Sequence, residues 1–220
     1  MCIIAEMAKQ KITELQQAIG QLTTVAIFFA MQSCEYLKVT QAEKQQPNIL
    51  RLSNLRFFKD GKLIEHKNPH LEFLDCISIT FEMQKKDEKN NTVTQMALGD
   101  VNMCPVRMGA TVVQRIQSYK GANNDTPISA FWQFNRINHV TSKQVITAMK
   151  DTIQAIVEDV LSIKKEEIGM HLIRSGVAMA MFLGNCSVCL IMMIGCWSSN
   201  AFLQYIQNRL NNSATTFPKE

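Results

Sequence analysis

The chain has 220 residues, of which 46% are hydrophobic and 19% are charged, and its net charge at neutral pH is +4. This composition predicts one folded domain with a sizeable core and excludes a disordered chain. The mildly basic charge suits an anionic partner without requiring one. The seven cysteines are scattered, and the first residues contain too short an apolar stretch for a secretory signal. We therefore expect buried, reduced thiols in a protein that is not secreted.

The first half of the chain predicts helices followed by a small antiparallel sheet. Residues 7–38 have apolar side chains at helical spacing and are expected to be helical throughout, whereas 39–48 are polar. Asp60-Gly61 predicts the turn of a hairpin, because these residue types adopt the left-handed backbone of tight turns. A second hairpin is expected from the β-branched and aromatic residues of 76–84 and the returning strand 92–98.

The second half predicts mainly helices. One helix is expected over 105–118, where Pro105 occupies the first turn, and 121–138 is expected to be irregular. A longer helix should cover 142–163, with Thr141 and Gln144 as a capping box. Further helices are expected at three places, namely 167–183, 187–195 and 199–211. The order of elements indicates an α+β fold that is predominantly helical.

A run without charge extends from Ser175 to Gln204 and is long enough to be a membrane span. Gly184 and Asn185 in its middle are typical of a helix C-terminus. These residues favour short buried helices separated by turns, and a single-span membrane protein remains an alternative.

Four side chains that can hydrogen-bond lie within or next to this uncharged run. His171 and Arg174 are three residues apart on an expected helix, so they share one face. The guanidinium of Arg174 can bind two phosphate oxygens, and His171 can hold or donate a proton. Trp197 offers an indole N–H, and the hydroxyl of Tyr205 can act as a nucleophile. Each residue alone is common in ordinary helices, but the combined spacing favours a phosphate-binding site.

The segments "HLIR" (171–174) and "GCWSS" (195–199), followed by Tyr205, resemble the C-terminal signature of the tyrosine recombinases. The amino-acid sequence of residues 169–206 is especially similar to those of recombinase-like proteins of eukaryotic, notably algal, mobile elements. The resemblance covers about residues 20–211, which implies a tyrosine-recombinase catalytic-domain-like fold there. Residues 1–19 would then be a helical lead-in and 212–220 a frayed tail.

The same resemblance assigns two earlier positions. The family has an arginine on an early helix, closely followed by a glutamate; here Gln32 takes the place of the arginine and Glu35 is kept. The family's hairpin lysine matches Lys85 or Lys86, with Lys86 preferred because it is nearer the turn. Both lysines could instead be solubilising charges of the turn.

The resemblance implies DNA strand cleavage and rejoining. Tyr205 would attack a DNA phosphate to form a 3′-phosphotyrosyl link, and the hairpin lysine would protonate the departing 5′ oxygen. Arg174, His171 and Trp197 would stabilise charge on the other phosphate oxygens, with neither a metal nor another cofactor. Gln32 lacks the cationic fork of arginine, so impaired activity is expected, and a DNA-binding remnant without cleavage is the alternative.

The implied partner is double-stranded DNA, with a homo-oligomer, by family habit a synaptic tetramer, assembled on it. The location would be nuclear in a eukaryote and otherwise intracellular. Candidate contacts to the DNA backbone are the basic side chains Arg56, Lys59, Arg136 and Lys143. Cys186 and Cys189 form a C-x-x-C without a second ligand pair, so they are expected to be buried small residues and not a zinc site.

Overall fold

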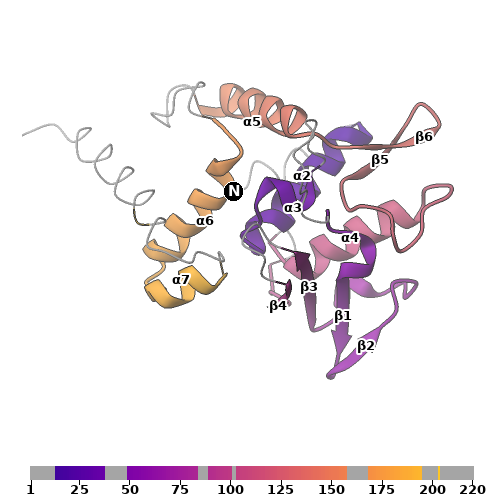
Figure 1. Ribbon diagram of the computed structural model, residues 1–220, viewed down its shortest axis with the longest axis horizontal. Helices are drawn as coiled ribbons and strands as arrows, with labels where there is room; N and C mark the ends of the chain where they lie inside the picture. The colour runs from indigo at the N-terminus through magenta and orange to yellow at the C-terminus, as the bar shows by residue number, and fades with distance from the viewer. Residues whose placement is uncertain are drawn as a thin grey trace, which may run out of the picture.

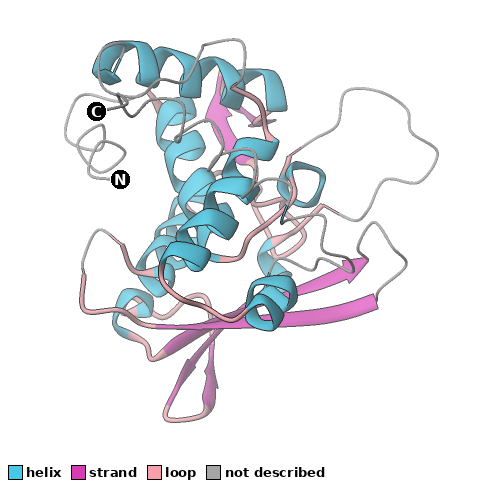
Figure 2. Cartoon of the chain, turned by 90° about the vertical axis from the view of Figure 1, so that its left-hand side faces the viewer, coloured by secondary structure: helices cyan, strands magenta, loops and turns pink. Residues whose placement is uncertain are grey.

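The computed structural model describes residues 13–37, 49–83, 89–100, 103–157, 168–194 and 203. Helices and a small antiparallel sheet alternate along the chain, and Figure 2 shows most helices on one side of the long strands. The α-helices are α2 (Glu14–Phe28), α3 (Ser33–Tyr36), α4 (Pro105–Gln117), α5 (Ser142–Val157), α6 (His171–Leu183) and α7 (Val188–Ile194). The α+β class with predominant helices is confirmed.

The strands form two separate sheets. The four-stranded sheet has the order β2-β1-β3-β4 and is antiparallel throughout, and a second hairpin pairs β5 with β6. The strands are β1 (Leu55–Lys59), β2 (Lys62–Ile64), β3 (Cys76–Met83), β4 (Lys89–Met96), β5 (Ala130–Gln133) and β6 (Arg136–His139). Two short 3-10 helices, η2 (Leu52–Asn54) and η3 (Leu71–Phe73), flank β1 and β2.

The predicted turns and caps are confirmed at three places. Asp60 and Gly61 have φ of 48° and 72° and join β1 to β2. Thr141 and Gln144 exchange hydrogen bonds at the start of α5, as the capping box requires. Asn185, with φ of 56°, ends α6 in a Schellman motif, in which the N–H of Cys186 bonds to the carbonyl of Met181 at 2.9 Å.

The expectation of an unbroken helix over 7–38 is wrong. The carbonyl of Ala26 accepts from the N–H of Met31 at 3.0 Å, and Ala30 between them has φ of 47°, so α2 ends in another Schellman motif. Alanine is the best helix former, so nothing in the sequence marked a stop at this position. The chain turns here and begins α3 at Ser33.

The expectation of irregular structure over 121–138 is also wrong, because β5 and β6 form a tight hairpin there. Its two-residue turn is Phe134-Asn135, with φ of 55° and 57°. Asparagine favours this geometry but phenylalanine does not, which is why the sequence pattern concealed the turn. Figure 1 shows this hairpin projecting away from α6 and α7.

Helix α2 is the centre of the core. It packs against α4, α5, α6 and β5, and Figure 1 shows it between these elements. Residues 21–26 are all buried, so this helix is covered on every side. Its polar side chains are hydrogen-bonded within the core: Thr24 donates to the carbonyl of Gly20, and Gln21 accepts from Arg115 Nε at 2.7 Å.

Arg115 is a buried cation that joins three elements, and the sequence analysis did not single it out. Its side chain is 8% exposed, and its Nη1 donates to the hydroxyl of Tyr119 and to the carbonyl of Ala130 in β5. The hydroxyl of Tyr119 donates in turn to Glu14 at the start of α2. Arg115 lies on the apolar face of α4. A charged residue among apolar residues at helical spacing is the sequence signal that could have predicted a buried arginine.

The cysteines are less buried than expected. Cys104 is buried, but Cys186 is half-buried and Cys189 is exposed. The expectation of a buried thiol is therefore wrong for Cys189, because α7 leaves that side uncovered within the described residues. Within these residues no group of three or more His, Cys, Asp or Glu side chains could hold a metal ion. No helix in the described ranges is both long and apolar enough to cross a membrane.

Gly109 in α4 should be intolerant of a side chain. A Cβ at this position would collide with the Cδ1 of Ile77 in β3, and Ile77 is itself fully buried. We expect Gly109→Ala to lower the free energy of unfolding by about 1–3 kcal/mol, because overpacking displaces the helix from the sheet. Urea denaturation measures the change.

The control is Gly20→Ala, because a Cβ on Gly20 in α2 meets nothing within 4 Å. It should be neutral or stabilise by up to about 1 kcal/mol, since alanine favours helix over glycine. Equal stability of the Gly109→Ala variant and the parent would contradict the close approach of α4 to the sheet.

Candidate functional site

Helix α3 places Gln32 and Glu35 beside each other. Gln32 is the N-cap residue, and its backbone N–H donates to Glu35 Oε2 at 2.7 Å, which is one half of a capping box. Because the chain turns at Ala30, this short helix is directed into the core, where Tyr36 is fully buried. Gln32 is half-buried, whereas Glu35 is only 4% exposed.

Helix α6 brings Arg174 close to Glu35. Burial raises the pKa of Glu35 to about 7, while the hydrogen bond from Gln32 and the positive charge of Arg174 oppose that rise. Arg174 is half-buried, and its Nε is shielded from solvent. The contact between α2 and α6 holds the two helices together. A charged residue of the second half of the chain therefore lies within electrostatic range of a buried carboxyl group of the first half.

His171 is the first residue of α6, so the helix begins four residues later than expected. Its side chain is exposed and its ring lies against Gly169, where a Cβ would come within 2.9 Å of the ring. His171 and Arg174 share a face of α6, as their spacing predicts. The histidine is thus available to solvent on the helix that carries the half-buried Arg174.

The remaining predicted catalytic residues lie outside the described residues, namely Lys85, Lys86, Trp197 and Tyr205. The structure brings together Gln32, Glu35 and Arg174, with His171 one turn away from Arg174. The convergence of the other four on this place stays a prediction.

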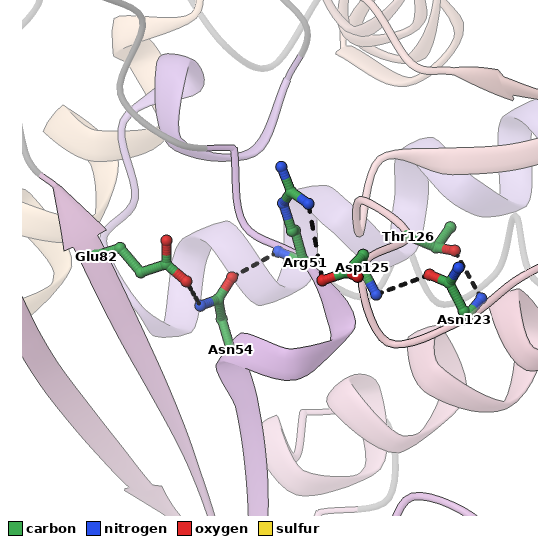
Figure 3. A network of polar contacts seen from close by, with 6 residues as sticks. All are labelled: Arg51, Asn54, Glu82, Asn123, Asp125 and Thr126. Atoms are coloured by element: carbon green, nitrogen blue, oxygen red, sulfur yellow. Dashed lines mark hydrogen bonds and ion pairs between the residues drawn. The ribbon is translucent and has the colours of Figure 1, made fainter.

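The strand that leads to Lys85 and Lys86 is anchored by a polar network (Figure 3). Asn54 is 7% exposed and donates through Nδ2 to Glu82 Oε1 in β3 at 2.9 Å. Its Oδ1 accepts from the backbone N–H of Arg51, and the guanidinium of Arg51 lies 3.8 Å from Asp125. The end of β3 is therefore tied to the loop that precedes β5.

The four predicted DNA contacts lie on two hairpins and a helix start. Arg56 is exposed on β1, and Lys59 is exposed but bonds to Asp75 at 2.6 Å, which partly neutralises its charge. Arg136 begins β6 and Lys143 lies in the first turn of α5, and both are exposed. Arg136 thus lies next to the turn of the β5–β6 hairpin, and Lys143 follows the hairpin in the chain.

Glu35 should make stability depend on pH. Its pKa in the folded protein, about 7, is above the ordinary value of 4.5, so the unfolded chain ionises first as pH rises. The free energy of unfolding should fall between pH 4.5 and 7 and then level off. Glu35→Gln keeps an acceptor for the Gln32 N–H and cannot ionise. At pH 8 the free energy of unfolding of this variant should therefore be higher than that of the parent by up to about 3 kcal/mol.

The measurement is urea denaturation at intervals from pH 4 to 8. The control is Glu65→Gln, because Glu65 directly follows β2 and is exposed. The control should follow the parent curve. A Glu35→Gln variant with the same pH dependence as the parent would show that this carboxyl group is not the one that titrates.

Comparison with known proteins finds similarity in structure alone. No protein-family model and no curated protein sequence matches the chain. The fold is similar to the XerH site-specific recombinase bound to its difH substrate in a pre-cleavage complex, with a TM-score of 0.59 and 12% identity. It is also similar to XerH bound to a palindromic difH substrate in a post-cleavage complex, with a TM-score of 0.56 and 12% identity.

These alignments cover 99% and 97% of this chain and 50% of each XerH chain, so the chain spans about half the length of those structures. The chain therefore has a tyrosine-recombinase catalytic-domain-like fold.

Proposed function

We propose that the chain is a DNA-binding domain of the tyrosine-recombinase type, in which DNA strand cleavage is impaired by Gln32. Residues 20–211 would form the catalytic domain, preceded by the lead-in 1–19 and followed by the tail 212–220. The predicted boundary at 19–20 falls inside α2, so part of the lead-in packs as one helix with the domain. The partner would be double-stranded DNA, bound by a homo-oligomer of a mobile-element protein, in the nucleus if the source is eukaryotic.

The observation that carries this proposal is that Arg174 of α6 lies near enough to Glu35 of α3 for its charge to lower the pKa of that carboxyl group. The resemblance in sequence expects the early-helix position, its following glutamate and the His-x-x-Arg helix to belong to one site. Glu35 accepts a hydrogen bond from the backbone N–H of Gln32, and the positive charge of Arg174 lowers the pKa of its carboxyl group. The fold similarity to a site-specific recombinase bound to its difH substrate is a separate support for a recombinase-like domain.

The chemistry follows from the residue types. The Tyr205 oxygen would form a bond to phosphorus and lose its proton to water, while the bond from phosphorus to the 5′ oxygen breaks. Lys85 or Lys86 would give that leaving oxygen a proton. Arg174, with His171 and Trp197, would donate hydrogen bonds to the non-bridging oxygens as their charge rises. Energy of the broken bond is kept in the phosphotyrosyl link, so rejoining needs no nucleotide.

Gln32 weakens this site in two ways. Its amide can donate hydrogen bonds but has no charge and no guanidinium fork, and loss of one transition-state donor costs roughly a hundred- to a thousand-fold in rate. Glu35 is retained although the arginine is absent, so an ionised Glu35 offsets the charge of Arg174. This observation favours the second candidate function, a DNA-binding domain that no longer cleaves.

Restoring the arginine should restore cleavage. A duplex target is first selected with the parent protein from a random-sequence pool, and a nicked version of that duplex then traps the covalent adduct. We expect little adduct with the parent, and Gln32→Arg should raise the rate of adduct formation by about a hundred-fold or more. The double variant Gln32→Arg/Tyr205→Phe should form none, because it lacks the nucleophile.

Each contrary result points to a different error. Equal adduct from the double variant would show that Tyr205 is not the nucleophile. Selective binding with no adduct from Gln32→Arg would establish the DNA-binding remnant. Failure to select any duplex would reject DNA binding itself.

A further inference from the structure

The tip of the β5–β6 hairpin exposes an aromatic side chain. Phe134 is 81% exposed and, with Asn135, forms the two-residue turn between the paired residues Gln133 and Arg136. Both turn residues have left-handed backbone, with φ of 55° and 57°. Phe134 has the largest exposed fraction among the large hydrophobic side chains of the described residues.

Phenylalanine at this position is unfavourable for the isolated domain on two grounds. A bulky side chain in the left-handed region costs roughly 1–2 kcal/mol relative to an ordinary backbone, whereas glycine would cost almost nothing. The ring also gains nothing from burial in the described structure. A bound partner that covers the ring would offset both costs.

The base of the hairpin is rigid, so the ring is presented in a fixed position. Trp132 stacks on Tyr119 with ring centroids 5.9 Å apart. The buried Arg115 donates to the carbonyl of Ala130 at 2.6 Å. Near the tip, Asn138 Nδ2 donates to the carbonyls of Gln133 and Arg136 at 2.8 and 3.1 Å. Binding of a partner at the tip would therefore cost little conformational entropy, because few groups of the hairpin would still have to become ordered.

The charge around the hairpin indicates an anionic partner. The two strands and their turn, residues 130–139, contain Arg136 and no aspartate or glutamate, and the exposed Lys143 follows them in the chain. Arg136 adjoins the turn, and its side chain is exposed. An aromatic ring beside cationic side chains suits nucleic acid, in which bases offer stacking surfaces and phosphates offer negative charge.

We propose that Phe134 is a DNA-contacting residue whose ring enters a groove and packs against bases, while Arg136 contacts a neighbouring phosphate. This inference rests on the proposed DNA-binding function and adds to it a contact that is aromatic and insensitive to salt. Apolar side chains that enter a groove unstack a base step, so the hairpin would prefer steps that separate easily.

The test compares variants on the duplex selected by the parent and on a version with 2-aminopurine at successive positions. Phe134→Ala should weaken binding by about 5- to 100-fold with an unchanged dependence on salt concentration. It should also abolish the fluorescence increase of the 2-aminopurine that reports unstacking. Phe134→Tyr should retain both properties, and Arg136→Gln should reduce the salt slope by about 1.

The matched control is Phe73→Ala, since Phe73 is 60% exposed in η3, beside the four-stranded sheet. It should bind DNA as the parent does, and urea denaturation should show that Phe134→Ala is as stable as the parent. Unchanged affinity of Phe134→Ala, with a parent that binds, would overturn this inference alone. A loss of self-association by sedimentation without a loss of DNA affinity would overturn it in favour of a protein contact, whereas a parent that binds no duplex would reject the proposed function.

Discussion

The burial of residues 21–26 in α2 is the constraint on which the rest of the structure depends. A helix covered on all sides must offer apolar or internally bonded side chains in every direction, and residues 21–26 do so. Its neighbours α4, α5, α6 and β5 are consequently fixed relative to one another through it. Arg115 secures two of these contacts at once, because it bonds to Gln21 in α2 and to Ala130 in β5.

The same constraint determines the electrostatics of the candidate site. Glu35 follows α2 directly and is carried into the interior, where desolvation opposes its ionisation. A carboxyl group so placed is suited to a site with more positive charge than the nearby Arg174 provides. Position 32 carries an uncharged amide, so the backbone N–H of Gln32 and the charge of Arg174 are what oppose the desolvation of Glu35.

Local signals in the sequence predicted much of the fold. Asp60-Gly61, the Thr141 cap and Gly184-Asn185 each have a residue type that matches the backbone it adopts, and the structure confirms all three. Ala30 and Phe134 adopt left-handed backbone that neither residue type favours, so the break after α2 and the β5–β6 hairpin were missed. The bend at Ala30 depends on its buried neighbours, and the anchored strands on either side of Phe134 impose the turn there, so neither appears in a local pattern of residue types.

For the site, the resemblance selected Gln32 and Glu35 on one helix and Arg174 on another, and the structure places Glu35 near Arg174. Spacing along the chain could relate His171 to Arg174 but could not relate either residue to α3, because that contact is made through the core. The placement of Lys85, Lys86, Trp197 and Tyr205 is still a prediction from sequence.

The left-handed alanine after α2 limits which substitutions the residues packed around it can tolerate. Ala30 is held at φ of 47° by its buried neighbours Phe29 and Met31, since its own preference is for ordinary helix. A glycine there would keep the bend even in a loosened interior, whereas alanine keeps it only while the surrounding residues fit tightly. Drift in the packing around Phe29 and Met31 would thus reorient Gln32 and Glu35 without any substitution in α3, so buried residues outside this short helix determine how its side chains are placed.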